Sequence, residues 1–160
     1  GESSDDYAEV GRLTRWVIDP AKGTVHEQLI DARAGDFGRI DDRLVGMKAR
    51  YAYLMALDGE GNSEEPVYGS RLLKYDLTTG TCEEHNLGDG VRGGEPVFAP
   101  RSPDAAEDDG WVLTIIHDER TGTSALNIAD ARDFTGPPVA RVHLPQRVPY
   151  GAHGNWVPDR

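Results

Sequence analysis

The sequence predicts an all-β protein made of repeated four-stranded antiparallel sheets of the propeller kind. Segments rich in β-branched and aromatic residues alternate with Gly, Pro and Asp turn signals roughly every 8–12 residues. A glycine, an ionisable residue and a short apolar segment recur at Asp36, Glu95 and His153, about 59 and about 58 residues apart. One polar group opening a short strand at such a period is typical of propeller blades. No stretch has the pattern of an amphipathic helix of useful length.

The first two strands are expected at residues 12–19 and 24–30, because both stretches are rich in β-branched residues. Pro20 and Gly23 mark the turn between them. This hairpin would form the outer strands of a blade whose inner strands are missing from the sequence. The next blade then begins at Asp36.

That blade has its strands at residues 37–41, 50–57, 71–77 and 81–87. The second of these is aromatic and apolar almost throughout, which predicts burial on both faces. Gly80 is expected to supply a positive φ angle in the hairpin between the last two strands.

The last full blade begins at Glu95. Its buried second strand is expected at residues 111–118, its third at 124–130 and its outer strand at 139–145. Pro137 and Pro138 restrict that outer strand to a sheet edge. His153 would then open the inner strand of a further blade.

Composition limits the class of partner. The 160 residues include 28 acidic and 17 basic side chains, a formal charge of −11, which argues against nucleic acid or an anionic membrane. Cys82 is alone, so no disulfide can form within the chain, and a cytoplasmic location is expected. No apolar run approaches the ~20 residues of a transmembrane helix.

His153 is the candidate metal ligand. It lies between Gly151 and Gly154, after Pro149, so a neutral imidazole would be held on a stiff turn. A single histidine near the end of a sequence is more often a surface or core residue. The repeat strengthens the case, because carboxylates at Asp36 and Glu95 would converge with it on a propeller axis. The remaining histidines open no axial strand and are expected to be structural or exposed: His26, His85, His117 and His143.

Five motifs support a more specific assignment. In order they are GEPVFAPR, DDGWVLTIIHD, LNIADARDF, PPVARVHLP and RVPYGAHGNWVP. Together they closely resemble the C-terminal part of the carotenoid cleavage oxygenases, a family that includes bacterial apocarotenoid and lignostilbene dioxygenases. The resemblance extends from about Arg12 to the end of the sequence.

This resemblance implies a partial seven-bladed β-propeller. Residues 1–160 would be the C-terminal part of one propeller domain, with blade boundaries near 36, 95 and 153. They would form about two complete four-stranded blades and parts of two others. Family members bind a non-haem Fe(2+) on the axis through four histidines, and three glutamates hold three of these from behind. His153 matches the last iron ligand, and Glu95 matches the last of the glutamates.

Asp36 departs from the family pattern. It stands where the family usually has glutamate in an E-F-P-R-type motif, and Gly38 replaces the proline. The side chain is shorter by one methylene, so its hydrogen bond to a ligating histidine is an open question.

The resemblance implies a dioxygenase that cleaves a conjugated C=C bond of a carotenoid, apocarotenoid or stilbene with O₂. One ligand of four is present, so the chain alone is expected to be inactive and to pair with the N-terminal remainder of the propeller or a second copy. Two alternatives remain. One is a non-catalytic β-propeller-like module or decayed fragment without a metal site, and the other is a sugar-binding or hydrolytic propeller using Asp36 and Glu95 as a carboxylate pair.

Overall fold

The computed structural model describes residues 11–58, 67–149, 151 and 153–158. Over these residues the fold is all-β, with two antiparallel five-stranded sheets and one 3-10 turn at Asp42–Leu44. The all-β class predicted from the sequence is therefore confirmed. Within the same ranges, no helix combines the length and hydropathy needed to cross a bilayer.

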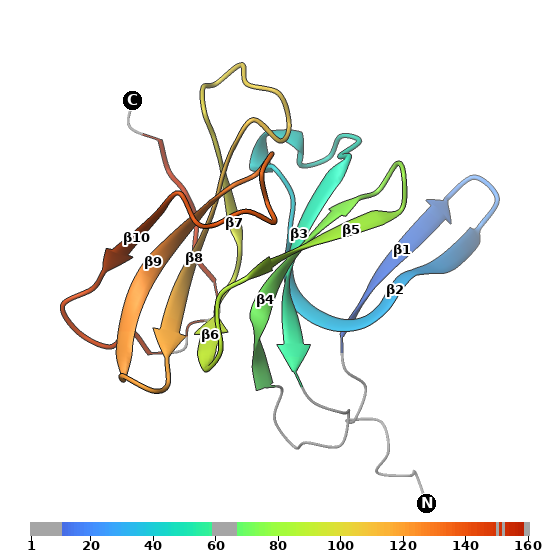
Figure 1. Cartoon of the computed structure of the whole chain (residues 1–160). Coiled ribbons are helices and arrows are strands. Elements are labelled where there is room, and N and C mark those ends of the chain that lie inside the picture. The colour runs from blue at the N-terminus through green and yellow to red at the C-terminus, as the bar shows by residue number, and fades with distance from the viewer. Residues whose placement is uncertain (1–10, 59–66, 150, 152, 159–160) are drawn as a thin grey trace, which may run out of the picture.

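The first sheet has the order β1-β2-β3-β4-β5. Its strands are β1 (Arg12–Asp19), β2 (Thr24–Arg39), β3 (Tyr51–Asp58), β4 (Val67–Asp76) and β5 (Thr81–Asn86). The hairpin of β1 and β2 projects from one end of the molecule (Figure 1). Gly80 has a φ of 74° in the turn before β5, as expected for its place in the hairpin.

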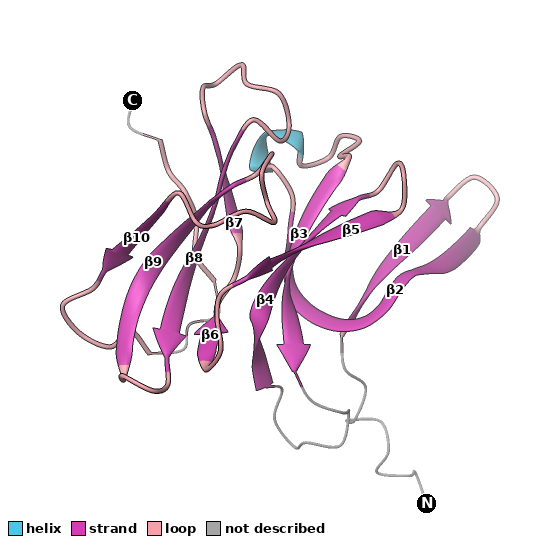
Figure 2. Cartoon of the chain, viewed as in Figure 1, coloured by secondary structure: helices cyan, strands magenta, loops and turns pink. Residues whose placement is uncertain are grey.

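The second sheet has the order β10-β9-β8-β6, and β7 also pairs with β8. Its strands are β6 (Val91–Gly93), β7 (Val97–Pro100), β8 (Gly110–Asp118), β9 (Thr123–Asp130) and β10 (Ala140–His143). Every residue of β10 is exposed, as expected for an edge strand. The two sheets lie side by side in the molecule (Figure 2).

The main core lies between the two sheets. Tyr53 of β3 stacks on Phe98 of β7, with ring centroids 5.9 Å apart, and Met55 belongs to the same buried cluster. A second cluster on the opposite face of the first sheet contains Ala52, Leu54, Ala56, Leu73 and Tyr75. Since alternate strand residues point to opposite faces, β3 is buried on both faces, as its apolar sequence predicts.

Strand β8 differs from the expectation of a fully buried strand. Its buried and partly exposed positions alternate, and Ile115 is 39 % exposed. One face packs in the core against the first sheet, whereas the other borders a cavity described below. Period-2 burial is what a strand covered on one face requires.

Strand β2 is one continuous strand rather than the two that we expected at residues 24–30 and 37–41. Its first part pairs with β1 as far as Ala34, and from Gly35 its partner is β3. Backbone hydrogen bonding therefore continues while the partner changes, so no turn is needed. The boundary expected near residue 36 lies inside this strand, next to that change of partner.

Residues 153–158 form no strand, although we expected His153 to begin one. A strand needs a neighbouring ladder, and none of the described pairings includes this segment. It is held instead by hydrogen bonds from and to Arg39 and Glu95.

A buried histidine connects the two sheets. His85 of β5 is 1 % exposed, and its Nδ1 donates to the carbonyl oxygen of Phe134 at 2.9 Å. Its Nε2 accepts from the side-chain amide of Asn127 on β9 at 3.2 Å. Both ring nitrogens are satisfied in the neutral ring, which agrees with the structural role expected for this histidine. Burial, together with the nearby Arg141, lowers the pKa of His85.

Stability should therefore fall in acid through His85. Because its folded pKa lies below the unfolded value of about 6.5, the unfolded chain takes up the proton first as the pH falls. We expect the free energy of unfolding to drop below that pH by at most about 1.4 kcal/mol per pH unit. Urea unfolding at several pH values checks this. His85→Gln should lose the dependence and the exposed control His143→Gln should keep it; equal slopes in both variants would contradict the assignment.

Candidate functional site

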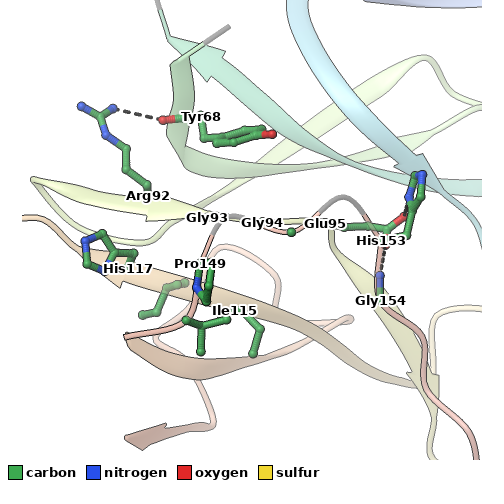
Figure 3. A pocket seen from close by; sticks show the side chains of 13 residues that line it. Tyr68, Arg92, Gly93, Gly94, Glu95, Ile115, His117, Pro149, His153 and Gly154 are labelled. Atoms are coloured by element: carbon green, nitrogen blue, oxygen red, sulfur yellow. Dashed lines mark hydrogen bonds and ion pairs between the residues drawn. The ribbon is translucent and has the colours of Figure 1, made fainter. Parts of the chain in front are cut away.

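A cavity of about 210 Å³ lies where β4, β6 and β8 meet the C-terminal segment. Ile115 and Ile116 of β8 form an apolar wall, together with Val148 and Pro149 of the segment that follows β10. His153 lies beside Glu95 at the cavity, with its ring next to the carboxylate (Figure 3). The structure thus brings together two of the three site residues expected from the sequence.

Glu95 lies in a break of the inner strand. β6 and β7 both pair with β8, and residues 94–96 between them leave the ladder. The N–H of Gly94 still donates to the carbonyl of Ile115 on β8 and also to the hydroxyl of Thr114, whereas Pro96 has no N–H to contribute. Glu95 therefore lies in the interruption between β6 and β7 rather than at the first residue of a strand.

Three donors hold the Glu95 carboxylate, which is only 6 % exposed. Gly154 N–H donates to Oε2 at 2.6 Å, and Arg39 Nη1 donates to Oε1 at 3.1 Å. His153 Nδ1 lies 3.3 Å from the same Oε1. Burial opposes ionisation, but the bonds from Gly154, Arg39 and His153 outweigh it and lower the pKa of Glu95. Glu95 is therefore an acceptor in this site rather than a proton donor.

The contact with Glu95 determines which nitrogen of His153 is available. An ionised carboxylate can only accept, so in the neutral ring this contact favours the tautomer with the proton on Nδ1 and the lone pair on Nε2. The side chain is 78 % exposed, which leaves Nε2 accessible. Phe37 meets the imidazole edge-to-face, with centroids 6.1 Å apart. An oriented neutral imidazole backed by a carboxylate is the usual form of a histidine metal ligand.

Asp36 takes no part in the contact between Glu95 and His153. It is exposed in an irregular part of β2, and its Oδ1 accepts from the N–H of Phe37 at 2.7 Å. Phe37 has a φ of 54°, the one positive value at a non-glycine residue in the described part of the chain. Such backbone strain is concentrated at functional sites. The carboxylate of Asp36 is not brought to His153, so the two carboxylates do not form a pair around one histidine.

Arg39 is the residue that the sequence analysis missed. It ends β2, and its guanidinium contacts Glu95, the carbonyl of Gly154 and the side chain of Asn155. The available signal was its place three residues after Asp36, on the same strand as a site residue. A lone basic residue in a strand does not reveal its long-range partners.

The other histidines do not add ligands to this centre. His26 and His143 are exposed, and His85 is in the core. His117 lines the cavity, with Nδ1 3.5 Å from the hydroxyl of Ser124. Across the described ranges, no group of three His, Cys, Asp or Glu side chains could hold a metal ion. The residues present therefore fit a metal through a single position, Nε2 of His153.

The sequence profile of the family described as retinal pigment epithelial membrane protein matches residues 2–158. This chain belongs to the carotenoid cleavage oxygenase family. The family resemblance drawn from the five motifs is thereby confirmed, over nearly the full chain.

Several curated proteins of this family are similar in sequence to most of this chain. The apocarotenoid-15,15'-oxygenase of Synechocystis is 38 % identical over 153 residues, covering 95 % of this chain and 30 % of that protein. A carotenoid cleavage oxygenase of Mycobacterium tuberculosis is 37 % identical and covers 91 % and 29 %. The zeaxanthin 7,8(7',8')-cleavage dioxygenase of Crocus sativus is 38 % identical and covers 89 % and 39 %. The chain thus spans roughly a third of the length of these carotenoid cleavage oxygenases.

Solved structures of the family agree with the fold. The crystal structure of cobalt-substituted Synechocystis ACO aligns with a TM-score of 0.84 at 35 % identity, over 96 % of this chain and 32 % of that one. The fold of this chain is therefore that of the corresponding part of a family member.

Ionisation of Glu95 should control the attachment of the C-terminal segment. Because its folded pKa is lower than the ordinary value of 4.5, its contribution is complete above that pH and is lost as the pH falls through the folded pKa. The Gly154 amide resonance, followed by NMR, should shift with a midpoint below 4.5, and Glu95→Gln should abolish this titration. A midpoint at or above 4.5 would show that the carboxylate is not held as described.

Proposed function

We propose that the chain is the C-terminal segment of a non-haem Fe(2+)-dependent dioxygenase, which oxidatively cleaves a conjugated C=C bond of a carotenoid, apocarotenoid or stilbene. The observation that carries this proposal is the His153–Glu95 contact, which leaves an oriented Nε2 accessible. Family membership and the names of the relatives support the same type of reaction.

His153 would hold the iron through Nε2, as one of four imidazole ligands. When bound, the iron supplies the oxidative chemistry with O₂. Imidazole nitrogen is a suitable ligand for iron, and the relative studied with cobalt in place of its own metal supports a metal-dependent site. Asp36 would accept from a second ligating histidine supplied by the rest of the protein.

Besides His153, the proposal gives roles to Glu95 and to the apolar wall of the cavity. Glu95 keeps the proton on Nδ1 of His153 and fixes the plane of the ring. The wall of Ile115, Ile116 and Val148 offers an apolar surface to the polyene or stilbene and limits the access of water. No proton transfer by a side chain is required of the chain.

The chain alone should be inactive, because a single imidazole binds Fe(2+) too weakly for a stable site. We place the two sheets as adjacent blades of a seven-bladed propeller that is completed by the N-terminal remainder of the protein, or by a second copy of this chain. The hairpin supports this placement, because five of its large apolar side chains are more than half exposed: Trp16, Val17, Ile18, Val25 and Leu29.

Metal content should separate the enzyme from a non-catalytic module. We expect the chain, co-purified with the N-terminal remainder of a full-length family protein, to bind about one iron per complex. His153→Ala should lose the iron and the cleavage of an apocarotenoid, and Glu95→Gln should bind iron about 10–100-fold more weakly. Elemental analysis and product chromatography measure both. His143→Ala, on exposed β10, is the matched control and should resemble the unsubstituted complex. Absence of iron from the unsubstituted complex would favour the non-catalytic module, and iron retained by His153→Ala would reject His153 as a ligand.

The exposed hairpin should drive association. Light scattering of the chain alone should detect self-association, and a hydrophobic dye should bind to it, because so much apolar surface is exposed. Replacing Trp16 and Ile18 together by Ser should reduce dye binding and weaken binding to the N-terminal remainder by tenfold or so. Burying one apolar side chain fully contributes about 1.5–3 kcal/mol, from which the cost of ordering the side chains at the interface is subtracted. A monodisperse monomer with little dye binding would argue against an incomplete propeller.

A further inference from the structure

Arg39 connects three parts of the molecule that are far apart in the sequence. It lies at the end of β2 in the first sheet, and its side chain is 18 % exposed. Its Nη1 donates to Oε1 of Glu95 in the second sheet at 3.1 Å and to the carbonyl oxygen of Gly154 at 3.0 Å. One nitrogen therefore holds both the carboxylate behind His153 and the backbone beside it.

The second terminal nitrogen of Arg39 completes the connection. Nη2 donates to Oδ1 of Asn155 at 3.2 Å and to both carboxylate oxygens of Asp42 at 3.1 and 3.0 Å. Asp42 is 51 % exposed and lies in the 3-10 turn after β2. A rigid planar group with several donors can satisfy such divergent acceptors together, whereas a lysine ammonium cannot.

We infer that Arg39 is a positioning residue for His153: it fixes the Glu95 carboxylate and the Gly154–Asn155 backbone so that Nδ1 of the imidazole is the protonated nitrogen. The inference rests on the proposed function in one respect, namely that the orientation of His153 serves metal binding. It deepens that proposal by naming a residue that contacts neither the metal position nor the substrate cavity.

Arg39 affects His153 because it holds the negatively charged carboxylate of Glu95 beside the imidazole. Glu95 is nearly buried, so its carboxylate is held by protein donors rather than by water. Arg39 is the one cation with a permanent charge among the three donors that the structure gives this carboxylate. Without it, Oε1 would lose its strongest partner, and the segment that carries His153 would lose two of its attachments to β2. The acceptor for Nδ1–H would then no longer be held in place.

The test is the tautomer of His153 in the metal-free 160-residue chain. Long-range ¹H–¹⁵N couplings at about pH 8.5, above the ordinary histidine range, give the ratio of the Nδ1–H to the Nε2–H form. We expect Arg39→Met to lower this ratio about tenfold and to accelerate exchange of the Gly154 amide proton, because one charge-assisted bond behind the ring is lost. Arg39→Lys keeps the charge without the planar fork, so we expect a smaller decrease of about threefold.

Asp42→Asn provides the matched control. It removes the other anion paired with Arg39 but leaves the contacts to Glu95, Gly154 and Asn155, so the tautomer ratio should stay within about twofold of the unsubstituted chain's value. A merely structural role for Arg39 would lower the thermal midpoint of both Arg39 variants while leaving the tautomer ratio unchanged. That result overturns the inference. Should Arg39→Met fail to fold, an unchanged ratio in Arg39→Lys overturns it equally.

The experiment also distinguishes this inference from the proposed function. The couplings are measured without metal, so a lower ratio in the Arg39 variants supports positioning even if His153→Ala retains iron in the completed protein. In the opposite case, loss of iron with His153→Ala and an unchanged tautomer in the Arg39 variants supports the metal ligand and rejects Arg39 as its positioning residue.

Discussion

The ionised carboxylate of Glu95 is the interaction on which the site depends. It is nearly buried, so it needs donors, and the structure supplies them from β2, from the C-terminal segment and from the imidazole itself. Arg39 comes from β2, whereas Gly154 and His153 come from the C-terminal segment, and the charge therefore holds together two segments that form no common ladder. This explains how a segment without strand pairing keeps a defined place, and why the proton of His153 is directed to one nitrogen.

Irregular strands carry both acidic site residues. Glu95 lies where the pairing of the second sheet with β8 is interrupted, and Asp36 lies where the register of β2 against β3 shifts, next to the strained Phe37. A regular strand would direct these side chains alternately into the two faces of a sheet. At these irregular positions Glu95 accepts from the C-terminal segment, whereas Asp36 accepts from the neighbouring Phe37 N–H. The regular strands form the sheets, and the irregular positions in β2 and between β6 and β7 carry the two acidic residues of the site.

Much of the fold follows from local patterns in the sequence. The positions of β1, β3, β5 and β9 agree with the expected strands to within one residue or so, because β-branched and apolar runs end at clear turn signals such as Gly80. The pairing of Glu95 with His153 was accessible through the repeat and the family motifs. The continuity of β2 was not, because a change of ladder partner leaves no mark in composition. The coil at residues 153–158 and the contacts of Arg39 also depend on neighbours distant in the sequence.

Strand β2 pairs with β1 through its first half and with β3 through its second, and the two halves differ in the changes of length that they tolerate. Its turn with β1 is exposed and far from the carboxylate, so added residues at Pro20–Gly23 would lengthen a solvated loop at small cost. One residue inserted between Ala34 and Arg39 would reverse which face each following side chain occupies. The guanidinium would then be carried to the wrong side of the sheet, away from Glu95. The hairpin tip of this chain can thus take a change in length, whereas the stretch from Ala34 to Arg39 depends on its residue count to keep the guanidinium beside Glu95.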